Sequence, residues 1–160
     1  MEAQIKIATE KKLIGKHIEM SFLENKTFQL WSGFMPKLKV ITNKIDACLY
    51  SLEVFPVNYF DNFDSGRTFQ KWAAVEVTDF DSVPDEMETL LIPNGLYAVF
   101  IHKGPASEGH KTYHTIFAEW LPNSEYTVDD RPHFAVMDEK YKKDDPNSEE
   151  EIWIPIKNRD

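Results

Sequence analysis

The last apolar stretch of the chain places an acidic side chain beside an aromatic one. In the run EEIWIPIK, Glu151 and Trp153 alternate with Ile152 and Ile154, so a strand here would carry the acid and the indole on one face. A buried carboxylate without a partner is costly, and it persists where a ligand or hydrogen bonds compensate it. An aromatic wall adds cation–π attraction of about 0.5–2 kcal/mol per good contact. The pair is therefore a candidate acid and wall of a pocket for a delocalised or quaternary cation, the alternative being that Glu151 is a solvated charge at a strand start.

Other rings and acids are candidates for the same site. Trp120 is expected mainly in the core between a helix and the sheet, and also at the edge of the cleft. Glu119, beside it, is interpreted either as a second acid of the pocket or as a surface charge of that helix. Glu53 and Glu76 lie inside apolar runs and are interpreted as outward-facing strand residues. Catalytic residues stay unassigned, and the predicted ligand-binding set is Glu151, Trp153, Trp72, Trp120, Tyr50, Tyr113 and Glu119.

Other chemistries lack a complete set of residues in this sequence. His110 and His114 have a metal-compatible spacing, but no glutamate lies beside His110 and no third ligand is evident, so no metal site is predicted. The chain has neither a Gly-rich phosphate loop nor a Gly-x-Ser-x-Gly elbow. Cys48 is the single cysteine, which excludes an internal disulfide, and its apolar context favours a buried small side chain. We therefore predict no cofactor.

Charge and hydropathy limit the classes of partner. The net charge of −9 disfavours nucleic acid, whose binding depends on Lys and Arg, and it favours cationic ligands in a focusing cleft. No run approaches the roughly 20 apolar residues of a membrane span, and the N-terminus lacks the apolar segment of a secretory signal. We therefore expect a cytoplasmic protein that neither binds nucleic acid directly nor enters a membrane.

The second half of the chain predicts a strand, a helix and two further strands. Residues 97–102 alternate with period two, and Gly104-Pro105 ends the run. Four apolar side chains then fall on one helical face, namely Tyr113, Ile116, Phe117 and Trp120. Strand-like runs follow at 133–137 and 152–156, so the unit is strand, helix, strand, strand.

The first half has the same order of predicted elements. A strand near 13–22 precedes a helix, with Asn25 as its N-cap and a stripe of Phe28, Trp31, Phe34 and Met35, and strands follow at 47–55 and 67–77. The acidic segment 79–88 is the expected surface connector. Aligning the end of each unit pairs Val75 with Ile154 and Trp72 with Glu151. We therefore predict one domain over residues 1–160, with repeats at about 11–78 and 88–157. Its fold class is α+β, an antiparallel sheet with pseudo-twofold symmetry and a central cleft.

These motifs together resemble a known family. The segments YAVFIHKGP, TYHTIFAEWLPNSEYTVDDRPHFAVMDE and EEIWIPIK, with LWSGFMP and KWAAVEV in the first half, are similar to the GyrI-like small-molecule-binding domain. That domain is the effector-binding part of AraC- and MerR-type multidrug regulators and also exists as a free-standing protein. The resemblance implies two strand–helix–strand–strand repeats around an aromatic cleft. It also implies that the cleft, as in multidrug-sensing members, holds a buried glutamate that meets lipophilic cations. Many relatives have a glutamate directly after the Phe of the Pro-x-Phe strand, where this chain has Ala135.

Three functions follow as hypotheses from this resemblance. The first is a free-standing binding module, without a DNA-binding region, that senses or sequesters cationic drugs or toxins. The second is a hydrolase of reactive cyclopropane-type genotoxins, in which a carboxylate activates water. The third is an interaction protein that inhibits DNA gyrase or acts beside a regulator, suggested by the acidic run at 138–151. The expected ligands in the first case are small hydrophobic cations.

Overall fold

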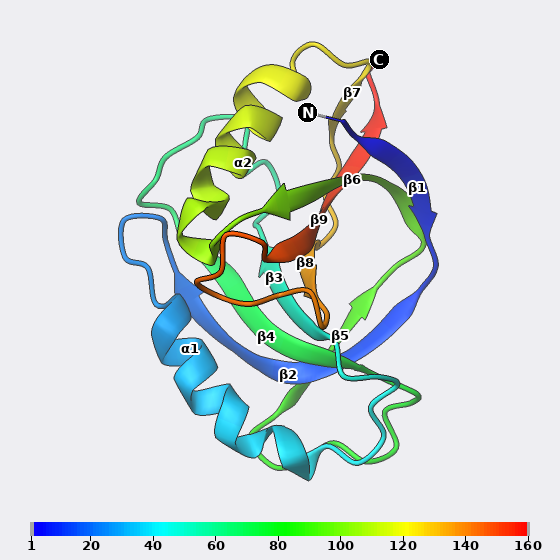
Figure 1. The fold of residues 1–160 in the computed structure, drawn as a ribbon. Coiled ribbons are helices and arrows are strands. Elements are labelled where there is room, and N and C mark those ends of the chain that lie inside the picture. Colours follow the sequence, from blue (N-terminus) through cyan, green and yellow to red (C-terminus); the bar gives the residue numbers. More distant parts are fainter. Residues whose placement is uncertain (1, 160) are drawn as a thin grey trace.

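The computed structural model describes residues 2–159, in which one antiparallel sheet carries two helices (Figure 1). The strands are β1 (Gln4–Ala8), β2 (Lys11–Met20), β3 (Leu49–Val54), β4 (Phe69–Val77), β5 (Glu88–Ile92), β6 (Gly95–Lys103), β7 (Tyr126–Val128), β8 (His133–Met137) and β9 (Glu149–Asn158). The helical elements are α1 (Thr27–Phe34), the 3₁₀ turns η1 (Met35–Val40) and η2 (Ala106–Glu108), α2 (Gly109–Thr115) and the π-helical turn η3 (Ile116–Trp120). The predicted α+β class is confirmed. No helix within residues 2–159 is long and apolar enough to span a membrane.

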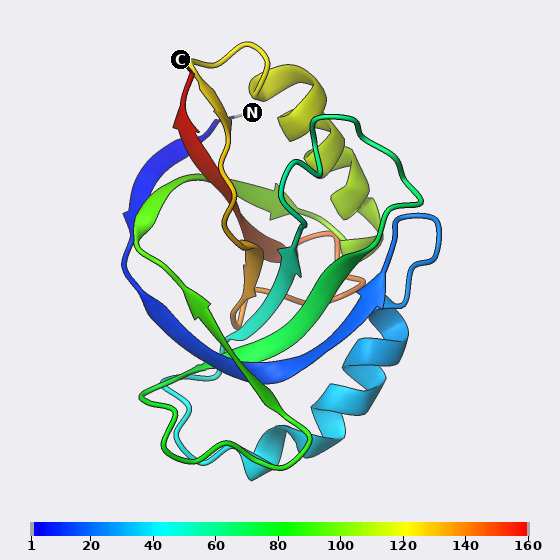
Figure 2. The same cartoon turned by 180° about the vertical axis from the view of Figure 1, so that it is seen from behind.

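The sheet is strongly curled, and its strand order is β1-β6-β9-β8-β3-β4-β2-β5, with β7 paired to β9. Both helices lie on one side of it, which we call the helix face, and β1 curls to the other side, as the two opposite views show (Figures 1 and 2). The concave side enclosed with β1 and β5 is called the inner face. Successive side chains of each strand alternate between these two faces.

The hydrogen-bond register relates the two halves by a pseudo-twofold axis at the Ser51–Ala135 pair of β3 and β8. On one side of this pair Leu52 lies opposite Trp72, and on the other side Val136 lies opposite Glu151. Trp72 and Glu151 are therefore equivalent positions, as the alignment of the repeats predicts. The edge strands follow the same symmetry, because β1 pairs with β6 while β5 pairs with β2.

Each helix covers the outer pair of strands in its own half. Leu30 and Phe34 of α1 pack on β2 and β4, and Ile116 after α2 packs on β6 and β9. The stripe predicted for α2 is confirmed, because its four apolar residues all join this second cluster.

The stripe predicted for α1 is only partly correct. Phe34 is buried and Trp31 is half-buried, but Phe28 is 79% exposed and Met35 is 45% exposed. The reason is local: the buried face of this two-turn helix is set by Leu30 and Phe34 at i and i+4, and the chain then tightens into a 3₁₀ turn at Met35. The prediction of Asn25 as the N-cap is wrong by one residue, because Lys26 takes that position. The Asn25 side chain still accepts a hydrogen bond from the Thr27 N–H (2.9 Å).

Candidate functional site

The structure brings four of the seven predicted site residues to the inner face. Trp72 and Tyr50 join its buried apolar cluster, and Trp153 packs against it. The Trp153 ring stacks on Phe134 (centroids 5.2 Å apart), and the Trp153 indole N–H donates to a Glu151 carboxylate oxygen (3.0 Å). Acid and indole therefore lie together, as the alternation predicts.

The inner face is a filled core around these rings. Trp72 is 3% exposed, Tyr50 4% and Phe134 1%, and Ala8 from β1 and Ile92 from β5 belong to the same cluster. The cation–π position over the Trp153 ring is already taken by the Lys6 ammonium, 5.8 Å from the ring centroid. A lipophilic ligand would have to displace this packing to reach the Trp72 ring.

An inner-face acid that the sequence interpretation missed is Glu76. It shares its face with Trp72, and its carboxylate accepts a hydrogen bond from the Tyr50 hydroxyl (3.4 Å) and lies 3.6 Å from the Lys11 ammonium. Burial, together with the charge of Glu76, raises the pKa of Tyr50. The alternation of Trp72, Ala74 and Glu76 along β4 is the signal that identifies this residue's face.

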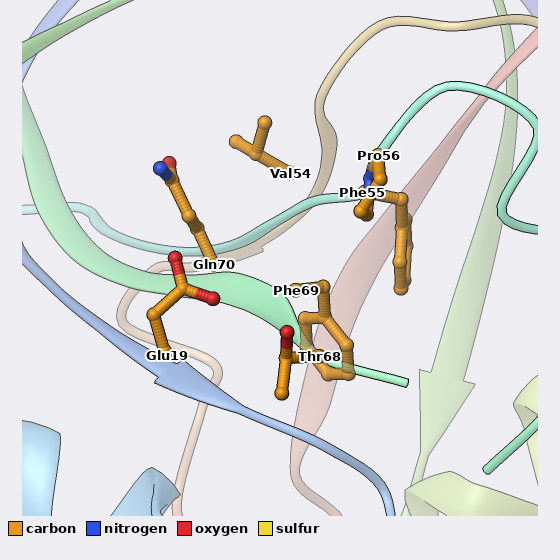
Figure 3. A pocket seen from close by; sticks show the side chains of 7 residues that line it. All are labelled: Glu19, Val54, Phe55, Pro56, Thr68, Phe69 and Gln70. Carbon is orange, nitrogen blue, oxygen red and sulfur yellow. The ribbon is translucent and has the colours of Figure 1, made fainter. Parts of the chain in front are cut away.

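A cavity of about 210 Å³ opens at the rim of the inner face, where β3 turns into β4. Figure 3 shows the Glu19 and Gln70 side chains pointing to the same side of the sheet. Gln70 also accepts a hydrogen bond from the Trp72 indole (3.0 Å). The remaining residues around the cavity are Val54, Phe55, Pro56, Thr68 and Phe69.

The other three predicted site residues are elsewhere. Tyr113 and Trp120 lie on the helix face, where Trp120 packs edge-on against Phe100 (5.1 Å) and stacks with Tyr126 (6.4 Å). Glu119 is exposed on the π-helical turn, the surface alternative of its two interpretations. The predicted set is thus divided between the two faces of the sheet.

A second acidic site lies on the helix face between the two helices. Ser51 and Glu53 of β3, with His133 and Ala135 of β8, belong to neither helix cluster. Ser51 stays partly exposed at the pseudo-twofold axis, whereas Glu53, His133 and Ala135 are buried. We use the name helix-face groove for the strip that these four residues form on the two central strands, between the two clusters that pack under the helices. Position 135, where the family resemblance led us to expect a glutamate, therefore belongs to this groove and faces away from Trp72 and Glu151.

Glu53 provides a carboxylate in this groove. It is 9% exposed and forms an ion pair with Lys71, its direct cross-strand partner on β4. Glu150 of β9 also faces the groove: burial raises its pKa, the charges of His102 and Lys71 lower it, and the charge of Glu53 raises it again. Burial also raises the pKa of Tyr113, and the charges of Glu53 and Glu150 add to this effect. Two acids, one lysine and one phenol therefore share a small, poorly solvated region.

The prediction that Glu53 faces outward is correct for the face of the sheet and wrong for the exposure of the side chain. Glu53 does point to the face opposite Leu52. At Glu53 that face is not open to solvent, because the residue is only 9% exposed. The charged partner Lys71, at the directly opposite position, is visible only once the register of β3 and β4 is known.

Aromatic rings close one end of the groove. The Phe60 ring, from the loop between β3 and β4, stacks on Phe117 (5.5 Å, 10° between planes) and on the His133 ring (5.6 Å). Burial lowers the pKa of His133 to about 3, so its ring is neutral at pH 7. Phe117 belongs to the π-helical turn η3, a helix irregularity that is frequent at functional sites. The rings and acids together suit a cation with apolar substituents, and the Tyr113–Glu150 region suits proton transfer.

No group of three or more potential metal ligands occurs among the described residues 2–159. Near the groove, both ring nitrogens of His102 lie within hydrogen-bond distance of other groups of the chain. His102 has Thr112 Oγ1 at 2.7 Å from Nδ1 and the Pro105 carbonyl at 3.0 Å from Nε2.

Comparison with known sequences gives a match over nearly the whole chain. The GyrI-like small molecule binding domain family matches residues 1–157. The transcriptional regulator BrlR of Pseudomonas aeruginosa is 28% identical over 130 residues, which are 80% of this chain and 45% of the regulator. The chain therefore spans less than half the length of that curated relative.

Solved structures share the fold. SAV2435, solved bound to tetraphenylphosphonium, is similar with a TM-score of 0.71 and 16% identity, covering 98% of this chain and 94% of that chain. A hydrolase encoded by lin2189 from Listeria innocua is similar with a TM-score of 0.59 and 12% identity, covering 98% of this chain and 92% of that chain.

Proposed function

This chain belongs to the GyrI-like family of small-molecule-binding domains, and we propose that it binds small lipophilic cations in the helix-face groove, with Glu53 as the counter-charge. The observation that carries the proposal is a buried carboxylate, Glu53, in the strip between the two helices. An acid in such a place stabilises a cation more strongly than one in bulk water would, because the local dielectric is low.

Glu53 takes the place of the glutamate expected at position 135. Ala135 pairs with Ser51 at the centre of the groove, and Glu53 lies two residues along β3 on the same face. Side chains at such diagonal positions are neighbours across a strand pair. The carboxylate has therefore moved to the adjacent strand while staying in the same groove.

The rings around the groove suit an apolar, delocalised cation. Phe60 and Phe117 present aromatic surface, and His133 adds a neutral ring to the same stack. Cation–π attraction and burial of apolar substituents then act together with Glu53. Tetraphenylphosphonium, the ligand of the similar protein SAV2435, has this chemistry and is the first probe.

The test is a titration of the full chain with tetraphenylphosphonium, followed by fluorescence of its four tryptophans and by calorimetry. Tetraphenylborate is the matched control, since it has the same shape and the opposite charge. We expect saturable binding of the cation, and at least a tenfold loss, about 1.4 kcal/mol, in Glu53→Gln. Glu119→Gln, on the exposed turn, serves as the control variant and should bind as wild type does.

A second variant tests the inner face as the alternative location. Glu151→Gln removes the acid beside Trp153 and leaves the groove intact. If Glu151→Gln abolishes cation binding while Glu53→Gln does not, the ligand binds among the inner-face rings. Equal binding of tetraphenylphosphonium and tetraphenylborate would contradict a charge-selective site altogether.

A hydrolase is the second candidate function, favoured by the electrostatic influence of Glu53 and Glu150 on the buried Tyr113 phenol and of Glu53 on Glu150. A carboxylate whose pKa is raised, as burial does for Glu150, is suited to accept a proton from an attacking water. The test is turnover of an activated cyclopropane, with Glu150→Gln and Tyr113→Phe expected to lose turnover. Binding of such a compound without turnover would contradict the hydrolase function and remain consistent with a binding function.

A further inference from the structure

Lys71 occupies the position that a cationic ligand must take. Its ammonium pairs with Glu53 inside the groove, and both side chains are nearly buried, at 14% and 12% exposed. Its charge also acts on Glu150, across the groove on β9. The charge of Glu53 is therefore compensated, without a ligand, by a residue of the chain itself.

We propose that Lys71 is a tethered competitor for the ligand and determines which charge the groove accepts, an inference that rests on the proposed cation site. A cation that contacts Glu53 meets the Lys71 ammonium at close range, where repulsion is strong because little solvent screens it. Binding thus requires the ammonium to leave Glu53.

The geometry allows such a movement. Lys71 is joined to β4 by a flexible four-carbon stem, and its side chain is 14% exposed, so the ammonium lies close to solvent. A swing of the ammonium away from Glu53 frees that carboxylate for the ligand. The Lys71 ammonium and the ligand cation therefore compete for the Glu53 carboxylate.

Removal of the carboxylate partner of Lys71 gives a second, more specific expectation. In Glu53→Gln the Lys71 ammonium loses its direct partner in a poorly solvated groove, and an unpaired buried charge favours a counter-ion. The groove is then expected to prefer tetraphenylborate over tetraphenylphosphonium. A role for Lys71 that is merely structural would not reverse the selectivity.

The experiment measures both probes on four forms at pH 8: wild type, Lys71→Met, Glu53→Gln and the double variant. We expect Lys71→Met to bind tetraphenylphosphonium about tenfold more tightly, Glu53→Gln to reverse the preference, and the double variant to bind both probes alike. Lys103→Met is the matched control, since Lys103 is 73% exposed and lies outside the groove. Unchanged cation affinity in folded Lys71→Met, or no reversal in Glu53→Gln, would overturn the role of Lys71.

A measurement on the unmodified chain removes dependence on how well the variants fold. The ammonium resonance of Lys71 in a lysine-selective NMR spectrum should shift or broaden as tetraphenylphosphonium is added, while that of Lys103 stays. Cation binding with an unmoved Lys71 resonance refutes the competition and leaves the proposed function standing. Absence of cation binding in both wild type and Lys71→Met refutes the proposed function itself.

Discussion

At the scale of single residues, the helix-face groove combines charged and neutral groups in a small buried volume. Glu53 is paired with Lys71, whereas His133, the residue directly opposite Glu53 on β8, is kept neutral by burial. This difference has a physical basis. An ion pair compensates part of the cost of desolvation, and a lone imidazole avoids the cost by remaining unprotonated.

The neutral state of His133 predicts a pH dependence of stability. Its folded-state pKa, about 3, is below the ordinary value of 6.5, so below pH 6.5 the unfolded chain binds a proton that the folded chain does not. Stability contributed by this residue is complete above pH 6.5 and is lost as the pH falls towards 3. Between pH 7.5 and 5, wild type should lose about 2 kcal/mol more than His133→Phe, which keeps the ring stack. Urea unfolding at the two pH values measures it, and equal losses would contradict a neutral buried imidazole.

At the scale of elements, β2 and β4 approach closely because β2 has a glycine on its inner face. A Cβ on Gly15 would lie 2.0 Å from the Ala73 carbonyl oxygen and 2.7 Å from the Ala74 Cα. Both opposing atoms are backbone and cannot move without shifting β4. This contact holds the strand that carries both Trp72 and Lys71, and so it positions residues on both faces.

A pair of glycine substitutions tests this element contact. Gly15→Ala should lower the free energy of unfolding by at least about 2 kcal/mol, because the strands must separate. Gly33→Ala in α1, where no atom lies within 4 Å of the added Cβ, should instead raise it by about 0.5–1 kcal/mol through helix propensity. Denaturant midpoints of the two variants provide the comparison. An unchanged free energy of unfolding in Gly15→Ala would show that a Cβ fits between β2 and β4.

At the scale of the whole molecule, the two halves share one inner core and exchange their edge strands. Trp72 and Tyr50 come from the first half, and Tyr97 and Phe134 from the second. In addition, β1 pairs with β6 of the second half, while β5 pairs with β2 of the first. Neither half can therefore complete its sheet or cover its rings alone.

Separated halves are therefore expected not to fold. Residues 1–86 and 87–160, expressed as two fragments, should each lack a cooperative unfolding transition, because each exposes its share of the inner core. Mixing the fragments should restore a cooperative transition by circular dichroism. A cooperative transition in either fragment by itself would show that the repeats are independent folding units.

The sequence by itself determined the two strand–helix–strand–strand units and which side chains share a strand face, but not the strands β1, β5 and β7. Periodicity of two and of 3.6 is a local property, so the equivalence of Trp72 and Glu151 and the stripe of α2 could be predicted and are confirmed. Only the tertiary structure decided which face is filled and which keeps a charged groove. The curl of the sheet and the covering strands β1 and β5 bury the inner-face rings, and the spacing of the helices leaves Ser51 and Glu53 between them. Those properties depend on contacts between segments far apart in the chain, which no local pattern contains.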